Sequence, residues 1–271
     1  MENKPAALLI PEWPAPANVK AWVTSRYSIS NNNSKPANSL GAFNLATHVE
    51  DSIDTVTQNR EALKAKLEES LDKEQKLSRI QWLEQVHGTQ IITATDMAVK
   101  PVPQADAIYC QLKGVACAVL TADCLPVIFC SDDGKEIAVA HAGWRGLADG
   151  ILQLTLEKFK ASPDHILAWL GPAIGPCHFQ VGDEIKQIFV QNNSGLASCF
   201  TPSNREGFET LPHWNADLFQ IAKKILLASG LQSITGGGLC TYCENQRFYS
   251  FRYCNEQNQQ SGRFATLICL A

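Results

Sequence analysis

Apolar residues recur at helical spacing in four stretches of the chain and predict a helix in each. The predicted helices span Ser52–Leu71, Leu147–Lys160, Asp183–Gln191 and Asn215–Ser229. Ser52, Asp183 and Asn215 are the expected N-terminal caps, because short polar side chains accept hydrogen bonds from the first free backbone amides. Gly230 is expected to end the last helix.

Short runs of β-branched and apolar residues, bounded by turn residues, predict the strands. They span Arg79–Val86, Gln90–Thr95, Val115–Leu120, Pro126–Cys130, Glu136–Ala140, Arg247–Arg252 and Arg263–Cys269. A tight turn at Gly88 is expected to join the first two, and the polar segment Ser28–Ser39 is expected to be a flexible loop. Helices and strands mix without strict alternation and no linker divides the chain. We therefore expect an α+β fold with mixed β-sheets flanked by helices, in a single domain over residues 1–271.

Composition narrows the class of protein. The 271 residues include ten cysteines, about 4%, well below the ~8–10% typical of disulfide scaffolds. The net charge of −4 argues against charge-driven binding of nucleic acid. The short apolar patch Ala6–Ile10 is not read as a signal peptide, because Pro5 and Pro11 flank it and Glu12 follows, and glycines and prolines interrupt the uncharged run His165–Gly182. We expect a soluble cytoplasmic protein with reduced cysteines and no membrane partner.

Three short segments place metal-binding residue types at strand ends beside turns. QVHGTQ contains His87, TADCLPVIFC contains Cys124 and AHAGWRG contains His141. Two imidazoles and one thiolate suit zinc and leave a fourth position open, as in catalytic zinc sites. The spacings of 37 and 17 residues match no recognised ligand motif. Two alternatives stay open: hydrogen-bonded turn histidines with a core thiol, or Cys124 as a nucleophile with His141 as its base.

Several familiar motifs are absent from the sequence. The chain has no dinucleotide or triphosphate glycine loop, no G-x-S-x-G elbow and no zinc deaminase signature, which combines H-x-E with P-C-x-x-C. Cys240 and Cys243 form a C-x-x-C pair. Packing or turn roles are favoured for this pair, and a redox motif or half of a structural zinc site are the alternatives.

A series of ordered segments runs through nearly the whole chain: TSR, FNLATHVEDS, NR, QVHG, DAIY, TADCLPV, AHAGWRG, GPAIGPCHFQVGDE, CTYCENQRFYSFR and SGRFATLICL. Through these segments the chain resembles the YfiH family. That family has been described as polyphenol oxidase or laccase-like, as purine nucleoside phosphorylase and as peptidoglycan editing factor. The resemblance implies an α/β/α-type mixed-sheet fold, shared distantly with toxin-type cysteine hydrolases. It also implies a zinc site formed by His87, Cys124 and His141.

The activity that the resemblance implies is phosphorolysis of adenosine, inosine and methylthioadenosine, together with adenosine deamination. The partners would be a small nucleoside and phosphate. A second hypothesis is an amide hydrolase that edits peptidoglycan precursors, with a UDP-muropeptide as its substrate. A third is a copper-dependent polyphenol oxidase, although six histidines in the whole chain are too few for a laccase-type multicopper centre. A fourth is a partner-binding protein with a closed zinc site, for which His178 is the spare ligand.

Candidate roles follow for residues around the metal ligands. Cys124 and Asp123 are the catalytic candidates, with Asp123 as an acid/base group or, alternatively, a turn carboxylate. The substrate-binding candidates are Arg26, Asn44, Arg60, Arg145 and Arg252. Arginine matches phosphate with two parallel donors, and Arg26 and Arg252 are favoured as anion binders. After Arg252 the sequence departs from the family pattern, because Tyr253 stands where a second arginine is usual.

Overall fold

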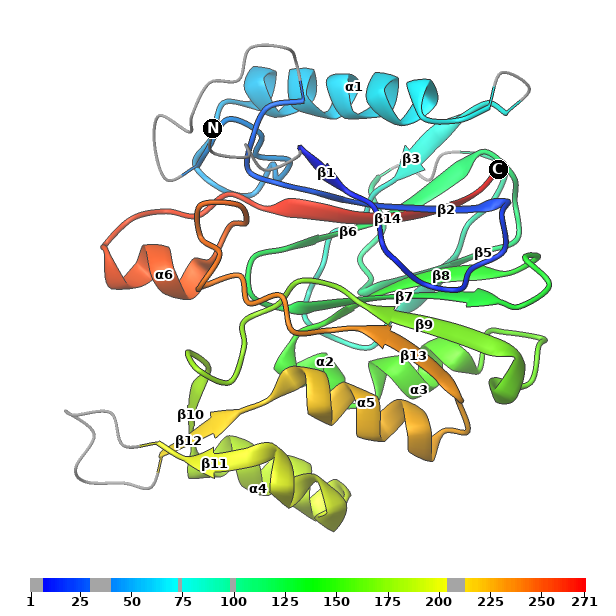
Figure 1. Ribbon diagram of the computed structural model, residues 1–271. Coiled ribbons are helices and arrows are strands. Elements are labelled where there is room, and N and C mark those ends of the chain that lie inside the picture. The colour runs from blue at the N-terminus through cyan, green and yellow to red at the C-terminus, as the bar shows by residue number, and fades with distance from the viewer. Residues whose placement is uncertain (1–6, 30–39, 73–74, 98–100, 204–212) are drawn as a thin grey trace.

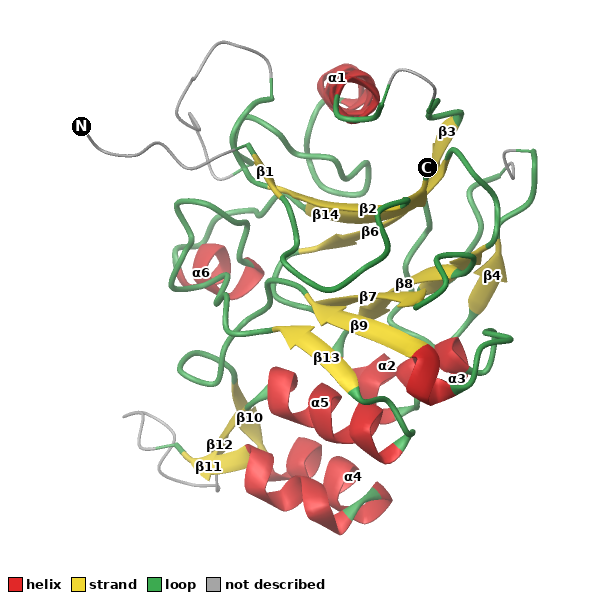
Figure 2. Ribbon diagram, turned by 45° about the vertical axis from the view of Figure 1, so that its right-hand side comes forward, coloured by secondary structure: helices red, strands yellow, loops and turns green. Residues whose placement is uncertain are grey.

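Two β-sheets lie one on the other at the centre of the fold, and helices cover both outer faces (Figures 1 and 2). This computed structural model describes residues 7–29, 40–72, 75–97, 101–203 and 213–271. The order of layers is therefore helix, sheet, sheet, helix. The expected α+β class with helix-flanked mixed sheets is confirmed, but two stacked sheets replace the single layer of an α/β/α arrangement.

The upper sheet in Figure 1 has five strands. Their order is β1 (Leu8–Leu9), β2 (Val19–Thr24), β14 (Phe264–Leu270), β6 (Val115–Thr121) and β3 (Arg79–Gln81). Helix α1 (Ile53–Glu69) covers its outer face, where Leu63 and Leu67 pack with Trp22 and Leu267. The C-terminal strand β14 pairs with β2 and β6, so both ends of the chain contribute to this sheet.

The second sheet has six strands. Their order is β13 (Ser233–Gly236), β9 (Ile166–Leu170), β7 (Leu125–Ser131), β8 (Ile137–Ala142), β5 (Ala107–Cys110) and β4 (Ile91–Thr93). Its outer face is covered by α2 (Trp144–Ala148), α3 (Ile151–Leu156) and α5 (Leu218–Ala228).

The position of β7 between the helices and the other sheet explains why its sequence is apolar at nearly every position. Val127 and Phe129 face the helices, whereas Ile128 and Cys130 face the other sheet, and all four are fully buried. A strand buried on both faces has no polar side, so it loses the alternating pattern of a surface strand.

A smaller unit lies beyond the helices of the second sheet. Its elements are the sheet β10 (Gln180–Gly182), β12 (His213–Ala216) and β11 (Phe200–Pro202), with α4 (Asp183–Asn192) and the 3-10 helix η2 (Ser194–Cys199). A second 3-10 helix, η1 (Pro163–His165), precedes β9. Helix α6 (Phe251–Glu256) lies to one side of the two large sheets (Figure 1).

Several predicted elements are confirmed. The helix predicted over Ser52–Leu71 is α1. Ser52 lies at its N-cap position, but its side chain makes no capping hydrogen bond. The strands predicted over Val115–Leu120, Pro126–Cys130, Glu136–Ala140 and Arg263–Cys269 correspond to β6, β7, β8 and β14. Most of the predicted loop Ser28–Ser39 lies outside the described residues, which resume at residue 40.

The hairpin predicted around Gly88 is wrong. The two strands there shrink to β3 and β4, and they belong to different sheets. The segment between them crosses from one sheet to the other, so no tight turn pairs them. The strand predicted over Arg247–Arg252 is also wrong, because this segment is a turn that leads into α6. Ser250 caps that helix by accepting a hydrogen bond from the amide of Tyr253.

Three helix predictions need correction at their ends. The helix predicted over Leu147–Lys160 is divided into α2 and α3 at Gly150, whose φ of 93° no helix interior allows. Asp183 is the first helical residue of α4 rather than its cap, and it accepts a hydrogen bond from the indole of Trp214. Asp217, not Asn215, caps α5, because Asn215 lies within β12.

None of the helices in the described part of the chain is long and apolar enough to cross a lipid bilayer.

Burial of Ile128 between the two sheets leads to a prediction about the stability of the protein. Replacing Ile128 by alanine leaves a cavity at a fully buried position, and we expect a loss of about 2–5 kcal/mol in the free energy of unfolding. The matched control is Ile53→Ala, at a side chain that is 58% exposed at the start of α1, with an expected change below about 0.5 kcal/mol. Urea denaturation measures both. Equal losses would contradict the assignment of the core.

Candidate functional site

The antiparallel pairing of β7 and β8 brings Cys124 and His141 to one end of the second sheet. Cys124 immediately precedes β7, and His141 is the penultimate residue of β8. In the register of the two strands, Pro126 pairs with His141 and Leu125 pairs with Ala142. The start of one strand and the end of its neighbour therefore meet at the same edge of the sheet, which explains how residues 17 positions apart become adjacent.

His87 reaches this edge from the crossing segment between the two sheets. Its φ is 60°, a left-handed conformation that costs a non-glycine residue energy and needs support from its surroundings. Asp106 gives that support. Its carboxylate accepts hydrogen bonds from the backbone amides of Val86 (3.3 Å), His87 (3.0 Å) and Gly88 (2.7 Å). A single buried carboxylate thus fixes the turn that carries His87.

Asp106 also orients His141. Its Oδ1 lies 2.8 Å from Nδ1 of His141, and both side chains are almost fully buried. This contact leaves Nε2 of His141 directed to the site. A carboxylate behind a histidine ligand is the usual arrangement in metal centres, because it fixes the tautomer and the orientation of the ring.

The three predicted metal ligands meet in space. The ligand atoms of His87, Cys124 and His141 all lie within 4.8 Å of one another, and the two imidazole rings stand edge to face with centroids 4.7 Å apart. Gly143 completes the space around them. A Cβ at this position would lie 3.0 Å from Cδ2 of His87 and 3.2 Å from Sγ of Cys124. The donor set and the space kept by Gly143 fit a bound metal ion.

The same geometry shifts the pKa values of Cys124 and His141 in opposite directions. Burial raises the pKa of Cys124, but the charge of His141 and hydrogen bonds from both histidines outweigh it and lower this pKa from 9.0 to about 6. Burial lowers the pKa of His141, but the charge of Cys124 and the hydrogen bond to Asp106 raise it to about 9. Without metal, the stable form between these values is a thiolate beside an imidazolium.

Asp123 lies next to Cys124, and its backbone has a φ of 89°. One carboxylate oxygen accepts a hydrogen bond from Oγ1 of Thr241 and the other accepts one from the backbone amide of Arg252, both at 2.6 Å. Burial raises the pKa of Asp123, and these hydrogen bonds oppose the shift only in part. The residue therefore anchors the C-terminal segment to the site. Its catalytic role stays a prediction.

The two arginines favoured as anion binders both donate hydrogen bonds to backbone carbonyl oxygens. Arg252 donates from Nη1 to the carbonyl oxygen of His178 (2.9 Å) and from Nη2 to that of Gln180 (3.3 Å). Arg26 donates to the carbonyl oxygen of Asn245 (2.6 Å), and its guanidinium lies 5.4 Å from the ring centroid of Tyr249. Anion binding by these residues stays a prediction.

Of the other three substrate-binding candidates, Asn44 is the most deeply buried. Its Nδ2 donates to the carbonyl oxygen of Ala46 and its Oδ1 accepts from the amide of Arg263. Arg60 donates to a backbone carbonyl oxygen and stacks on a tryptophan ring at 4.3 Å. Arg145 lies over the ring of its neighbour Trp144 at 4.4 Å. These contacts hold the scaffold, and they leave a role in substrate binding as a prediction.

Three residues beside the site were not assigned a role from the sequence. Asp106 lies in the DAIY segment, but the strand after it was not predicted, so nothing placed it beside His141. Burial lowers the pKa of His48, and the positive charges of Arg263, Arg60 and His87 lower it further. Burial lowers the pKa of Arg263, and the charge of Cys124 opposes this shift. Arg263 therefore interacts electrostatically with one of the three metal-ligand candidates.

His178, the spare ligand of the closed-site hypothesis, is not part of this site. Among the described residues it groups instead with Cys177, Cys240 and Cys243. Within the described part of the chain, the group at the sheet edge consists of three ligand side chains.

The lowered pKa of Cys124 predicts an unusual reactivity in metal-free protein. Because the thiolate is the nucleophile, alkylation by iodoacetamide should persist as the pH falls and should reach half its maximum near pH 6. Cys199, whose pKa burial raises, is the internal control and should stay unreactive there. Peptide mass spectrometry measures both. In His141→Ala the midpoint should move to higher pH, and an unchanged midpoint would contradict the thiolate–imidazolium pair.

Comparison with known proteins places this geometry in a family. The family model described as multi-copper polyphenol oxidoreductase laccase matches residues 23–271. The chain is 41% identical to purine nucleoside phosphorylase PA4543 of Pseudomonas aeruginosa, over 97% of this chain and 98% of the relative. It is 40% identical to purine nucleoside phosphorylase YfiH of Escherichia coli, with the same shares covered.

Solved structures agree. Neisseria meningitidis protein NMB0706, of family DUF152, superposes with a TM-score of 0.84 at 37% identity, over 98% of this chain and 99% of that one. Bacillus licheniformis YfiH superposes with a TM-score of 0.78 at 25% identity, over 93% of both chains. A match over nearly the whole length, in sequence and in fold, shows that this chain belongs to the YfiH family.

Proposed function

We propose that this chain is a zinc-dependent purine nucleoside phosphorylase that acts on adenosine, inosine and methylthioadenosine. The observation that carries the proposal is the convergence of His87, Cys124 and His141 at one edge of the second sheet. The names of the relatives support the reaction class. An open metal position and an anion-binding surface are the two features that phosphorolysis of a nucleoside by such a site needs.

Zinc is proposed as the metal on the basis of the donor set. One thiolate and two imidazoles with an open position match catalytic zinc sites, and zinc bound there supplies Lewis-acid chemistry. Copper also binds nitrogen ligands tightly. A laccase-type multicopper centre, however, needs more histidines than the four that remain in the chain after His87 and His141. Copper-dependent oxidation is therefore the weaker assignment.

Arg60 and Arg263 are the proposed phosphate site. The positive charges of both arginines lower the pKa of His48, and the charges of Cys124 and Asp123 oppose the lowering of the Arg263 pKa by burial. Asn44 holds Arg263 in this position through its backbone amide. Guanidinium groups bind phosphate through two parallel hydrogen bonds, which suits them to orient it towards a sugar carbon.

The proposed reaction transfers the sugar from the base to phosphate. A phosphate oxygen forms a bond to the anomeric carbon of the ribose, and the bond from that carbon to the purine nitrogen breaks. The electron pair of the broken bond stays on the base, which takes up a proton. Asp123, whose buried carboxyl has a raised pKa, is the proposed source of this proton. The products are the free base and the sugar 1-phosphate.

Deamination of adenosine at the same site is part of the proposal. Water adds to the purine carbon that bears the amino group, and ammonia leaves, so the reaction needs a group that accepts one proton and donates another. Asp123 is proposed for this role as well. Release of ammonia without phosphate would separate this activity from phosphorolysis.

An amide hydrolase acting on UDP-muropeptides is the second candidate, and one observation favours it. Asp106, His141 and Cys124 stand in the order of a carboxylate, an imidazole and a thiol, as in enzymes with a cysteine nucleophile. Such an enzyme needs no phosphate. Chromatography of UDP-muropeptides that carry the wrong first amino acid, with and without enzyme, tests it.

Phosphorolysis predicts that zinc-loaded protein releases hypoxanthine from inosine only when phosphate is present. Replacing Arg263 by glutamine removes a charged donor from the proposed anion site, and we expect the KM for phosphate to rise roughly 10- to 100-fold. Coupled spectrophotometric detection of hypoxanthine measures both. Arg79→Gln is the matched control, because its guanidinium binds the carbonyl oxygen of Asp96 on the surface, and its KM should not change.

Two results would contradict this assignment. Release of the base at the same rate without phosphate would make the enzyme a hydrolase. The proposed function would be rejected if the protein released no base from adenosine, inosine or methylthioadenosine while it held zinc at the His87, Cys124 and His141 site.

A further inference from the structure

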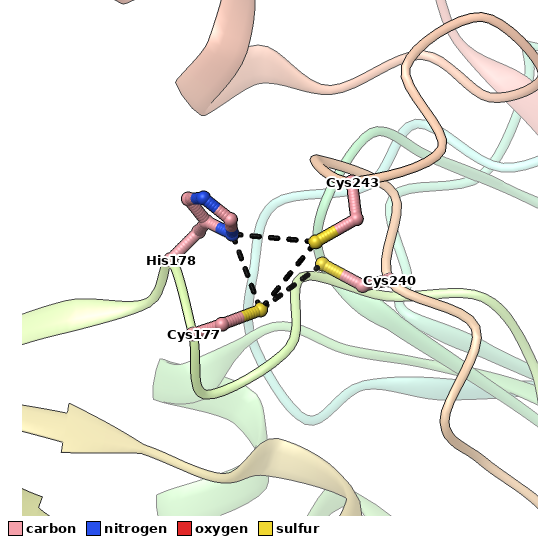
Figure 3. A group of neighbouring side chains, drawn as sticks. All are labelled: Cys177, His178, Cys240 and Cys243. Carbon is pink, nitrogen blue, oxygen red and sulfur yellow. Dashed lines mark hydrogen bonds between the residues drawn. The ribbon is translucent and has the colours of Figure 1, made fainter.

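Four soft ligand side chains gather outside the site described above, and the proposed function uses none of them. Cys177 and His178 lie in the connection between β9 and β10, and Cys240 and Cys243 lie in the segment after β13 (Figure 3). More than sixty residues separate the two pairs. Their ligand atoms nevertheless all lie within 4.8 Å of one another.

The separations between these atoms match a tetrahedral zinc site. Zinc–sulfur bonds of about 2.3 Å place two ligand sulfurs about 3.8 Å apart, and a sulfur and a nitrogen about 3.5 Å apart. Sγ of Cys177 lies 3.8 Å from Sγ of Cys240 and 3.6 Å from Sγ of Cys243. Nδ1 of His178 lies 3.5 Å from Sγ of Cys243 and 3.1 Å from Sγ of Cys177.

Contacts around the group orient it. The amide of Gly175 donates to Sγ of Cys240 at 3.2 Å, a contact of the kind that stabilises a ligand thiolate. The ring of His178 stacks on Tyr242, with centroids 3.7 Å apart and planes 14° from parallel. Figure 3 shows Nδ1 of His178 directed towards the sulfurs, an orientation that the stack on Tyr242 supports.

We propose that Cys177, His178, Cys240 and Cys243 bind a second zinc ion. Three thiolates and one imidazole fill all four tetrahedral positions, which is the arrangement of a structural rather than a catalytic zinc site. Binding displaces the thiol protons to solvent and leaves the oxidation states of metal and sulfur unchanged.

The second zinc ion would cross-link the β9–β10 connection and the segment after β13. Both segments contact residues next to the three-ligand site. Thr241, between the two ligand cysteines, donates to Asp123, which neighbours Cys124. The carbonyl oxygen of His178 accepts a hydrogen bond from Arg252. The backbone amide of Thr241 also donates to the carbonyl oxygen of Ala173, which joins the two segments directly. The proposed zinc would add four ligand bonds to a contact between these two segments that this backbone hydrogen bond already makes.

Metal counting by mass spectrometry tests the proposal on the full chain, purified with a reductant and zinc and then desalted. We expect two zinc ions per chain in the natural protein and one in the double variant Cys177→Ser, Cys243→Ser. His87→Ala with His141→Ala should also retain one, so the two sites are counted independently of any activity. Cys199→Ser, at a buried cysteine outside both groups, is the matched control and should retain two.

Thiol reactivity provides a second measurement that needs no variant. Cys177 and Cys243 are exposed, so both should react rapidly with a thiol reagent if they are free. We expect both to be protected in zinc-loaded protein and to become reactive after chelation. A single zinc ion per chain that survives the double substitution would overturn the proposal. So would rapid labelling of both cysteines before chelation, or a disulfide within the group in protein purified without reductant and supplied with zinc.

Discussion

The carboxylate of Asp106 is the contact on which the rest of the site depends. It is fully buried, and a buried charge is tolerated only where hydrogen bonds and an opposite charge satisfy it. Three backbone amides from residues 86–88 and the imidazole of His141 provide that satisfaction. The same bonds hold His87 in its left-handed conformation. The segment that crosses between the sheets is thus tied to the end of β8, and the metal ligands meet there.

Much of the centre of the fold follows from the sequence, because fully buried strands and an amphipathic helix leave clear patterns. β6, β7, β8 and α1 are examples. The wrong predictions occur where tertiary contacts override the local conformational preference of the residues. The residues around Gly88 resemble a hairpin, but their strands pair with different sheets. Asn215 is a good cap by type, but β12 takes it into a sheet and Asp217 caps the helix instead.

The candidate site divides in the same way. His87, Cys124 and His141 are recognisable by residue type and by their position at strand ends, whereas their proximity depends on strand register. Asp106 could not be assigned because β5 was not predicted, and its partners lie 18 to 35 residues away along the chain. Cys177 and Cys240 are still farther apart, so a local ligand motif could not reveal them. The pairing of distant segments decides which of these residues become neighbours, and the spacing of residues along the sequence does not reveal it.

One frame can support more than one chemistry here. The order of Asp106, His141 and Cys124 suits both a metal ligand set with its supporting carboxylate and a cysteine nucleophile with its base. Fold alone does not choose between them, because a family frame can host several reactions. The segment between Cys240 and Cys243 reaches Asp123 through the hydroxyl of Thr241, and the carbonyl oxygen of His178 accepts a hydrogen bond from Arg252.

The zinc affinity of an Asp106→Asn variant tests most directly the claim that this carboxylate assembles the metal centre. Asparagine keeps the shape but loses the charge and one acceptor, so affinity at the three-ligand site should fall about 10- to 100-fold by competition with a chelating dye. Asp132→Asn, at an exposed aspartate paired with His165, is the control and should leave affinity unchanged. Natural affinity in Asp106→Asn, with the fold intact by circular dichroism, would contradict the account.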